Sequence, residues 1–388
     1  MKQIKALFTP LLISIVGVIE LARINNAYFE KQIAFLILGI ILFFISSKIN
    51  LKRIMHHYLI FYLSGLLLLL LPLFLSHGSV KRWINIGGFT FQPSEVAKIF
   101  YLLFLASFFS EKERKKVGEF LKALFMSLVY FGLVFIEPDF ATASAFIFIF
   151  AIVSYVVGVD FNVLLVLALI PIAAMFSFSW ILYISLIVAL TIYLFTLKKR
   201  RFFLAILIYT TCFTFGLFTP YIWNKVLKPY QRQRIISFLD PEKHRETSGW
   251  QVYQGEIALG AAGFYGRFGE SFNQKNLRFL PAPHTDFIFS SIGEDVGFLG
   301  LVLLFALYAV FFSYMYNIVK KSKRMYIKVF ASGALSLFIY HVVFNIASNL
   351  GLFPVAGIPL ALLSYGGTHI ITEYTLLGLL EGMYERGE

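Results

Sequence analysis

Long apolar runs separated by short polar segments dominate this chain. A helix needs about 20 mostly apolar residues, or a few fewer, to cross the hydrocarbon core of a bilayer. We therefore predict a polytopic, all-α membrane protein with twelve spans, at Leu7–Ile24, Lys31–Ser47, Tyr58–Leu75, Ser94–Ser110, Phe120–Ile136, Ala141–Gly158, Asn162–Ser177, Trp180–Leu197, Phe202–Thr219, Asp286–Asn317, Ile327–Leu350 and Leu360–Gly382.

One polar segment, Pro220–Thr285, is too long to be a simple connection between two spans. Loops of that length are usually functional or independently folded. It is basic and contains Trp223 and Trp250, so we expect interfacial helices within it. The predicted organisation is an N-terminal transmembrane bundle at 1–219, a large extracytoplasmic loop at 220–285 and C-terminal transmembrane helices at 286–388.

Composition and charge agree with this prediction. The chain has 388 residues, of which 59% are hydrophobic and only 14% charged, far fewer than in soluble domains. Its net charge of +13 comes from basic clusters between apolar runs, so the positive charge does not indicate nucleic-acid binding. A cytoplasmic N-terminus puts four of these clusters on the cytoplasmic side, as the positive-inside rule requires, at Lys48–Arg53, Lys112–Lys116, Lys198–Arg201 and Lys320–Lys328. Both termini are then cytoplasmic, and the 220–285 loop is external.

Glu95 and Lys98 open the fourth predicted span on one helix face, because they are three residues apart. One interpretation is an ion pair that merely allows the helix to enter the membrane. The other is the charged floor of a cavity, in which Lys98 meets a phosphate. Ionisable residues within spans are candidate functional residues by default.

Asp286 follows His284 and Thr285 at a predicted helix start on the external side. The sequence alone favours a helix-capping acid, because the helix dipole stabilises acids there. Glu294 is eight residues further on, roughly on the same helical face, and could support a polar cavity.

Two external basic clusters are candidates for binding anionic groups. The first consists of Lys81 and Arg82 with the aromatic Trp83, for which a membrane anchor is the favoured role. Arg232 and Arg234 lie in the second, YQRQR. A solvated basic surface explains the second cluster equally well. Asp139, in a turn after a proline, is better explained as a helix cap than as a chemical group.

His369 and Glu373 lie one turn apart in the last predicted span. They could bind a metal in principle, but the sequence gives no third ligand in register, so a polar packing pair is favoured. The chain also lacks a Gly-rich phosphate loop, a zinc-binding spacing and a nucleophile elbow.

Four motifs, in order, resemble those of the SEDS family, the RodA, FtsW and SpoVE proteins. The motifs are KRWINIGGFTFQPSEVAK (Lys81–Lys98), YQRQRIISFLDP (Tyr230–Pro241), LPAPHTDFIFSSIGEDVGFLG (Leu280–Gly300) and GIPLALLSYGG (Gly357–Gly367), and together they cover most of the chain. Within the second motif, YQRQR and FLDP are most similar to the RodA branch.

The resemblance implies an inverting peptidoglycan glycosyltransferase of the inner (cytoplasmic) membrane that polymerises lipid II on the outer face, for cell elongation. Asp286 matches the essential acid of the family, and Glu95 and Lys98 match residues that line its central cavity. The further candidates for the substrate cavity are Arg82, Trp83, Arg232, Arg234, His284, Thr285, Glu294 and Ser364. A class B penicillin-binding protein is the implied partner. The sequence establishes no cofactor, and a divalent cation (Mg or Mn) is one candidate for stabilising the leaving pyrophosphate.

The chain also departs from the family pattern. Pro283 stands near the position of a usual Glu, and Arg278 replaces a further acid, so any assisting carboxylate is absent. Ala141 and Ala361 replace a usual Gly and Pro. The family has ten spans, so we place one additional helical hairpin within 162–197.

Three other functions stay open. A lipid II flippase needs polar groups through the full membrane depth, whereas a polymerase needs chemistry at the external mouth. A division-type polymerase of the FtsW kind would share the same site. A structural hub would recruit synthases without chemistry.

Overall fold

The computed structural model describes residues 2–76, 82–87, 89–110, 117–161, 164, 180–196, 209–210, 213–214, 217–219, 221–227, 229–245, 247, 249–267, 280 and 282–387. The described residues form two compact units. The larger comprises Met1–Val153 and Ser237–Glu388, and the smaller comprises Ser154–Ile236. Each unit is described by itself.

The larger unit is a bundle of long helices, with one short hairpin of two strands between α3 and α4. Its elements are α1 (Lys2–Ile24), α2 (Asn26–Ser47), η1 (Leu51–Arg53), α3 (Tyr58–Leu75), β1 (Ile84–Ile86), β2 (Phe89–Phe91), α4 (Pro93–Phe108), α5 (Val117–Ile136), most of α6 (Phe140–Val157), α11 (Trp250–Ala261), α12 (Ile288–Lys321), α13 (Met325–Asn349) and α14 (Gly367–Gly387).

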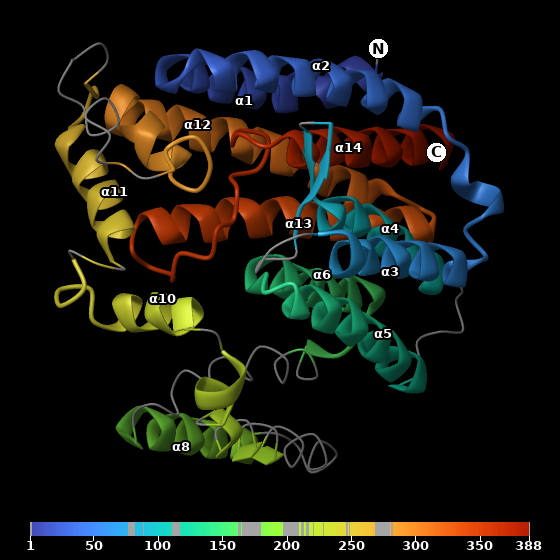
Figure 1. Cartoon of the computed structure of the whole chain (residues 1–388). Helices are drawn as coiled ribbons and strands as arrows, with labels where there is room; N and C mark the ends of the chain where they lie inside the picture. The colour runs from blue at the N-terminus through green and yellow to red at the C-terminus, as the bar shows by residue number, and fades with distance from the viewer. Residues whose placement is uncertain are drawn as a thin grey trace. The chain divides into compact units, whose positions relative to one another are not determined.

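Helix α14 lies inside this bundle and packs against α2, α4 and α13 (Figure 1). Helix α13 is similarly central, because it also contacts α4, α11 and α12. Both helices are buried along most of their length, although they carry several polar side chains. The candidate polar groups of α4, α13 and α14 therefore meet in the bundle interior rather than at lipid.

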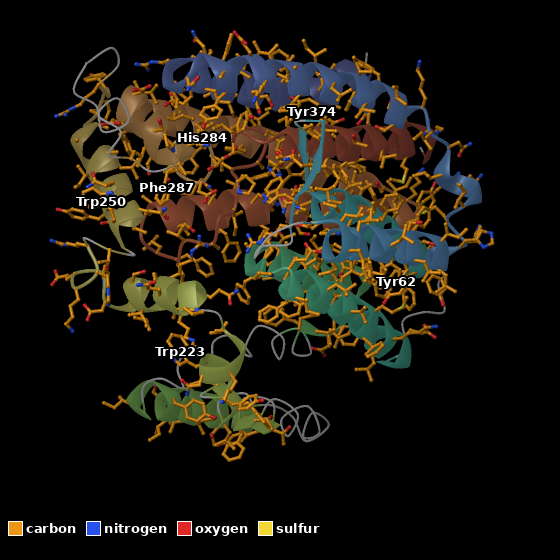
Figure 2. All side chains as sticks on the ribbon, in the orientation of Figure 1. Tyr62, Trp223, Trp250, His284, Phe287 and Tyr374 are labelled. Atoms are coloured by element: carbon orange, nitrogen blue, oxygen red, sulfur yellow. The ribbon has the colours of Figure 1, made fainter. Side chains whose placement is uncertain are left out.

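Aromatic packing joins α3, α4, α5 and α6. Tyr101 is fully buried, and its single hydroxyl proton lies within hydrogen-bond reach of both Ser127 Oγ (2.8 Å from the hydroxyl oxygen) and the Phe146 carbonyl (3.0 Å). Tyr130 donates to the carbonyl of Tyr62, whose ring lies 5.5 Å from its own. Tyr62 is labelled in Figure 2. Satisfying each buried hydroxyl while burying a large ring is how tyrosine stabilises a core.

Within the smaller unit the structure describes α8 (Trp180–Thr196), the short π-helical turn η3 (Ile222–Val226) and most of α10 (Pro229–Leu239). Helix α8 agrees with the predicted span Trp180–Leu197. The other half of the predicted hairpin, Asn162–Ser177, lies outside the described residues apart from Leu164, and so does most of Phe202–Thr219. The predicted 220–285 loop contains helices α10 and α11.

The helices correct three predicted boundaries. The residues between the predicted spans Leu7–Ile24 and Lys31–Ser47 do not form a loop, because the Asn25 side chain accepts the Ala27 N–H (2.8 Å) and α2 begins at Asn26. The segment from Leu360 to Gly366 is apolar but not helical, and α14 begins only at Gly367. Helix α12 is broken at Gly297, where φ is 66° and ψ is −167°.

Seven helices of the described residues are long and apolar enough to cross a membrane. The prediction of a polytopic, all-α membrane protein is confirmed. The total of twelve spans and the predicted division of the chain at 1–219, 220–285 and 286–388 stay predictions.

Candidate functional site

Asp286 lies in a turn, residues 282–287, directly before α12. The N-cap of α12 is Phe287 rather than Asp286. The Asp286 carbonyl accepts two side-chain amides from α13, Asn345 Nδ2 at 2.9 Å and Asn349 Nδ2 at 2.8 Å. Asp286 is half-buried, and α13 therefore fixes the position of its backbone.

A second loop, residues 357–366, docks on this turn. Ser364 Oγ donates to the Thr285 carbonyl (2.8 Å) and accepts the Leu360 N–H (2.7 Å). The Tyr365 N–H donates to the His284 carbonyl (2.8 Å). The structure thus brings together His284, Thr285, Asp286 and Ser364, which the sequence placed in two separate motifs.

Aromatic rings surround His284 next to the acid. The His284 ring stacks on Tyr28 with centroids 4.3 Å apart, and the Tyr365 ring lies 5.9 Å away. Burial lowers the pKa of His284, so the ring is neutral at pH 7. The sequence analysis did not identify Tyr28, which lies in the first turn of α2. Tyr28 and His284 are 256 positions apart, and no local pattern in the sequence connects them.

Gly357 begins the docking loop with φ of +72°, a left-handed conformation that disfavours other residues. A Cβ at this position would lie 3.6 Å from Asp286 Oδ2, at ordinary contact distance. We expect Gly357→Ala to destabilise the protein by about 1 kcal/mol through backbone strain, measured as a lower unfolding temperature in detergent.

Gly132→Ala is the matched control for Gly357→Ala. Gly132 lies within α5, and an added Cβ would meet nothing within 4 Å. Alanine favours the helix by up to about 1 kcal/mol, so this variant should be as stable as the unsubstituted protein or more so. Equal unfolding temperatures for the two variants would contradict the strain at Gly357.

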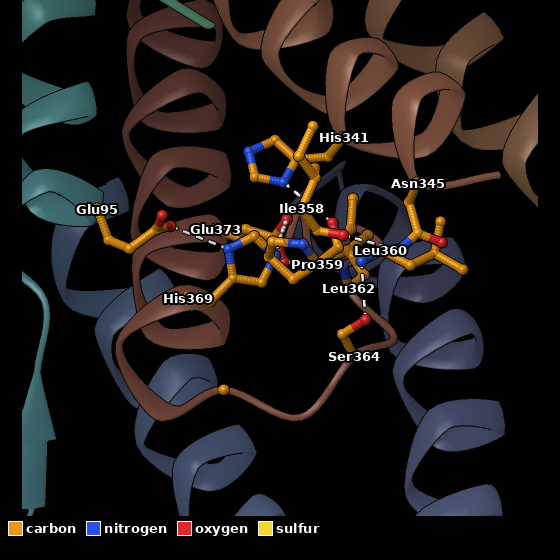
Figure 3. Close-up of polar contacts among 12 residues, drawn as sticks. Glu95, His341, Asn345, Ile358, Pro359, Leu360, Leu362, Ser364, His369 and Glu373 are labelled. Carbon is orange, nitrogen blue, oxygen red and sulfur yellow. Dashed lines mark hydrogen bonds and ion pairs between the residues drawn. The ribbon is translucent and has the colours of Figure 1, made fainter. Parts of the chain in front are cut away.

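Glu95 and Lys98 form a buried ion pair on α4, with Lys98 Nζ 2.7 Å from Glu95 Oε1. Figure 3 shows Glu95 facing His369 of α14, whose Nδ1 lies 2.9 Å from Glu95 Oε2. Lys98 Nζ also lies 3.3 Å from His341 Nε2 of α13. The pair is thus part of a larger network, and Lys98 is only 1% exposed. A contact between Lys98 and a phosphate stays a prediction.

Glu294 and Asp295 are fully buried on α12, just before its break. Arg23 of α1 forms an ion pair with Asp295, and the Glu294 carbonyl accepts the Arg267 N–H (2.9 Å). Asp286 precedes the helix, so the eight-residue spacing does not place it on one helical face with Glu294. A role of Glu294 in the cavity stays a prediction.

Arg82 and Trp83 precede strand β1, which is followed by a turn at Gly87. Trp83 is 47% exposed. Arg82 Nε donates to the Glu137 carbonyl (3.1 Å), and its Nη1 lies 3.9 Å from Asp139 Oδ2. Arg82 therefore supports the turn between α5 and α6.

Asp139 caps α6, as the sequence favoured. Its Oδ1 accepts the Thr142 N–H (3.1 Å), and its Oδ2 accepts Gln92 Nε2 (3.3 Å). An acid at this position satisfies a backbone donor that the helix leaves unpaired. The capping role of Asp139 is confirmed.

Glu137 is fully buried in the same turn, and neither carboxyl oxygen has a hydrogen-bond partner among the residues that the structure describes. Burial, with the nearby Asp139 charge, raises the pKa of Glu137 to about 8. The unfolded carboxyl ionises near pH 4.5, whereas the folded one keeps its proton until about pH 8. Between these values only the unfolded state loses a proton, so Glu137 makes stability fall as pH rises.

We therefore expect Glu137→Gln to stabilise the protein at pH 8 more than at pH 5. Each pKa unit corresponds to about 1.4 kcal/mol, so even a partial effect amounts to a few kcal/mol. The measurement is the difference in unfolding temperature between variant and unsubstituted protein at both pH values. A difference independent of pH would contradict the raised pKa.

Arg232 and Arg234 belong to the smaller unit and are described within it only. Arg232 donates from Nε to the Leu227 carbonyl (3.1 Å) and from Nη2 to the Asn224 carbonyl (3.2 Å). These bonds fold the start of α10 back on the preceding turn. Binding of anionic groups by the two arginines stays a prediction.

The residues that hold the site on α13 were also missed. His341, Asn345 and Asn349 recur every four residues within an apolar helix, so they form one polar stripe. A polar stripe in a membrane helix is a usable signal, because unpaired polar groups are costly in lipid. Here the stripe faces both docked loops, through Asp286 and through the carbonyls of Ile358 (2.7 Å) and Pro359 (3.1 Å).

A resident metal does not fit the described residues. No three His, Cys, Asp or Glu side chains in that part of the chain form a group that could hold an ion. The His369–Glu373 pair gains a third neighbour in Glu95, but Lys98 already neutralises it. No chemical step is therefore assigned to a protein-held metal.

Known proteins with related sequence and structure share this architecture. The FTSW_RODA_SPOVE profile, described as "Cell cycle protein", matches residues 4–185 and 166–386. Peptidoglycan glycosyltransferase RodA of Treponema pallidum (strain Nichols) is 31% identical over 403 residues, covering 95% of this chain and 92% of that protein.

Two solved structures are similar over nearly the whole chain. One comes from work titled "Structural coordination of polymerization and crosslinking by a peptidoglycan synthase complex", with a TM-score of 0.73, 25% identity and coverage of 98% of this chain and 97% of that chain. The rod shape determining protein RodA of Thermus thermophilus has a TM-score of 0.66 at 22% identity, with coverage of 99% and 97%. At that identity the second likeness shows the fold alone.

Proposed function

Because this chain belongs to the FtsW, RodA and SpoVE family, we propose that it is a peptidoglycan glycosyltransferase of the RodA type. It polymerises lipid II into glycan strands at the outer face of the cytoplasmic membrane and releases undecaprenyl pyrophosphate. The observation that carries this proposal is the way Asp286 is held directly before α12. Two side-chain amides of α13 donate to its backbone carbonyl.

Asp286 acts as the general base. Its carboxylate takes the proton of the acceptor sugar C4 hydroxyl as that oxygen attacks the anomeric carbon of the donor. The bond from that carbon to the pyrophosphate breaks, and the electron pair leaves with the diphosphate. Attack from the face opposite the leaving group inverts the anomeric configuration.

The leaving pyrophosphate needs positive charge nearby as it departs. The candidate cations are Arg82, Arg232, Arg234 and Lys98. Of the two in the larger unit, Arg82 is the more accessible to a substrate, because its side chain is 25% exposed and that of Lys98 only 1%. A divalent cation that arrives with the diphosphate is a further candidate. Chelation during the assay tests that cation separately.

The protein works beside a class B penicillin-binding protein, which crosslinks the strands. The similarity to a chain of a peptidoglycan synthase complex supports this partner. The basic clusters between spans support a cytoplasmic location for both termini.

The test is strand formation from purified lipid II by the full-length protein with its cognate partner in proteoliposomes. Polymerised glycan visible on a gel supports the proposal. A flippase would move labelled lipid II between leaflets without forming strands, and a hub would do neither, so either result would contradict it.

A further inference from the structure

Four ionisable side chains from α4 and α14 form one buried line, Lys98–Glu95–His369–Glu373. Lys98 is 1% exposed, and the other three are between 4% and 6% exposed. Their contacts run from Lys98 Nζ to Glu95 (2.7 Å), from Glu95 to His369 Nδ1 (2.9 Å) and from His369 Nε2 to Glu373 Oε1 (3.2 Å). Buried charges at this spacing must balance, because an uncompensated one is strongly destabilising.

The geometry assigns a positive charge to His369. Each of its ring nitrogens faces a carboxylate oxygen, although Nε2 is not aligned with Glu373 for a hydrogen bond. In a neutral imidazole one nitrogen carries a lone pair, which would face a carboxylate unfavourably. The protonated ring avoids this.

His341, the fifth member, is neutral by the same reasoning. Its Nδ1 lies 3.1 Å from the Pro359 carbonyl, which only accepts, so Nδ1 carries the proton. Its Nε2 lies 3.3 Å from the Lys98 ammonium, which only donates, so Nε2 carries the lone pair. The network then holds two positive and two negative charges and is neutral.

Glu373 connects this network to the candidate site. Its Oε2 accepts the N–H of Leu362 (2.8 Å), a buried residue with φ of +62°. A non-glycine residue in this conformation is strained and persists only where its surroundings hold it. Two residues later, Ser364 donates to the Thr285 carbonyl, next to Asp286.

We propose that His369 and Glu373 are positioning residues, which use a charge-balanced buried network to hold the strained 357–366 loop and thereby place Asp286. For its effect on rate, this inference rests on the proposed glycosyltransferase function. The two residues act through the loop and do not touch substrate.

The test is a double-mutant cycle of His369→Gln, Glu373→Gln and the double variant. Each single change leaves one buried charge unbalanced. We expect a lower unfolding temperature and about a 10-fold loss of kcat with little change in KM. The double variant restores neutrality, and the amide oxygen introduced by Glu373→Gln can still accept the Leu362 N–H. The unfolding temperature should therefore return toward that of the unsubstituted protein, and kcat should recover to within about threefold of its value. His56→Gln, on an exposed side chain, is the control.

Losses that add in the double variant, or single variants that behave as the unsubstituted protein, would overturn the proposal. If the single variants do not fold, recovery of folded protein in the double variant supports it, and continued failure to fold contradicts it. The coupling in unfolding temperature needs no activity. If the protein forms no strands, the proposed function is contradicted, but the unfolding temperatures of the variants still test the charge balance of the network.

Discussion

Asp286→Asn is expected to reduce strand formation from lipid II by at least about 100-fold, the lower range for loss of a general base. Asparagine has nearly the same shape but cannot accept a proton at neutral pH. The two hydrogen bonds from α13 reach the backbone carbonyl of Asp286, so they survive the change. The unfolding temperature should therefore change little. The measurements are the initial rate of polymerisation and thermal unfolding of the same preparations.

Glu242→Gln is the matched control for this experiment. Glu242 is another acid that becomes an amide, but its side chain is 84% exposed and lies 3.8 Å from Arg245. Its polymerisation rate should stay unchanged. Normal activity of Asp286→Asn would refute the role of general base, and a large fall in stability would assign Asp286 a structural role instead.

Lys98→Met is expected to cause the largest loss of stability of any single change considered. Lys98 is 1% exposed and lies between Glu95 and His341. Its removal leaves the buried network of Lys98, Glu95, His369, Glu373 and His341 with an uncompensated negative charge. Breaking a buried ion pair on one side costs about 3–5 kcal/mol. The measurement is the free energy of unfolding in detergent.

Two further variants separate charge from packing at this position. Lys52→Met changes an exposed lysine and should have almost no effect. Combining Lys98→Met with Glu95→Gln removes both charges and should recover part of the lost stability. A double variant as unstable as the sum of both single changes would show that packing, rather than charge, dominates.

Helices with continuous apolar sequence were predictable almost to the residue. The predicted span Tyr58–Leu75 has the bounds of α3, and Ile327–Leu350 differs from α13 (Met325–Asn349) by two residues or fewer at each end. In both segments the local requirement of a membrane helix, satisfied backbone and apolar side chains, decides the structure.

Prediction failed where tertiary contacts override local pattern. The predicted span Leu360–Gly382 begins within residues 357–366, yet these residues form a loop. Partners remote in sequence satisfy its backbone, among them Gln32, which bonds to Ser364 and Gly366 (3.2 Å each), and Glu373. The third neighbour of the His369–Glu373 pair was invisible for the same reason, because Glu95 is 274 positions from His369.

The sequence distance between Asp286 and its supports has a consequence for biosynthesis. The ribosome makes Asp286 first, and the amides that fix its carbonyl follow 59 and 63 residues later. Ser364 comes 79 residues after Thr285, and Glu373 later still. A nascent chain therefore carries its acid without a working site until α13 and α14 have been inserted. A protein truncated before α14 would contain Asp286 intact but leave the 357–366 loop without its Glu373 anchor.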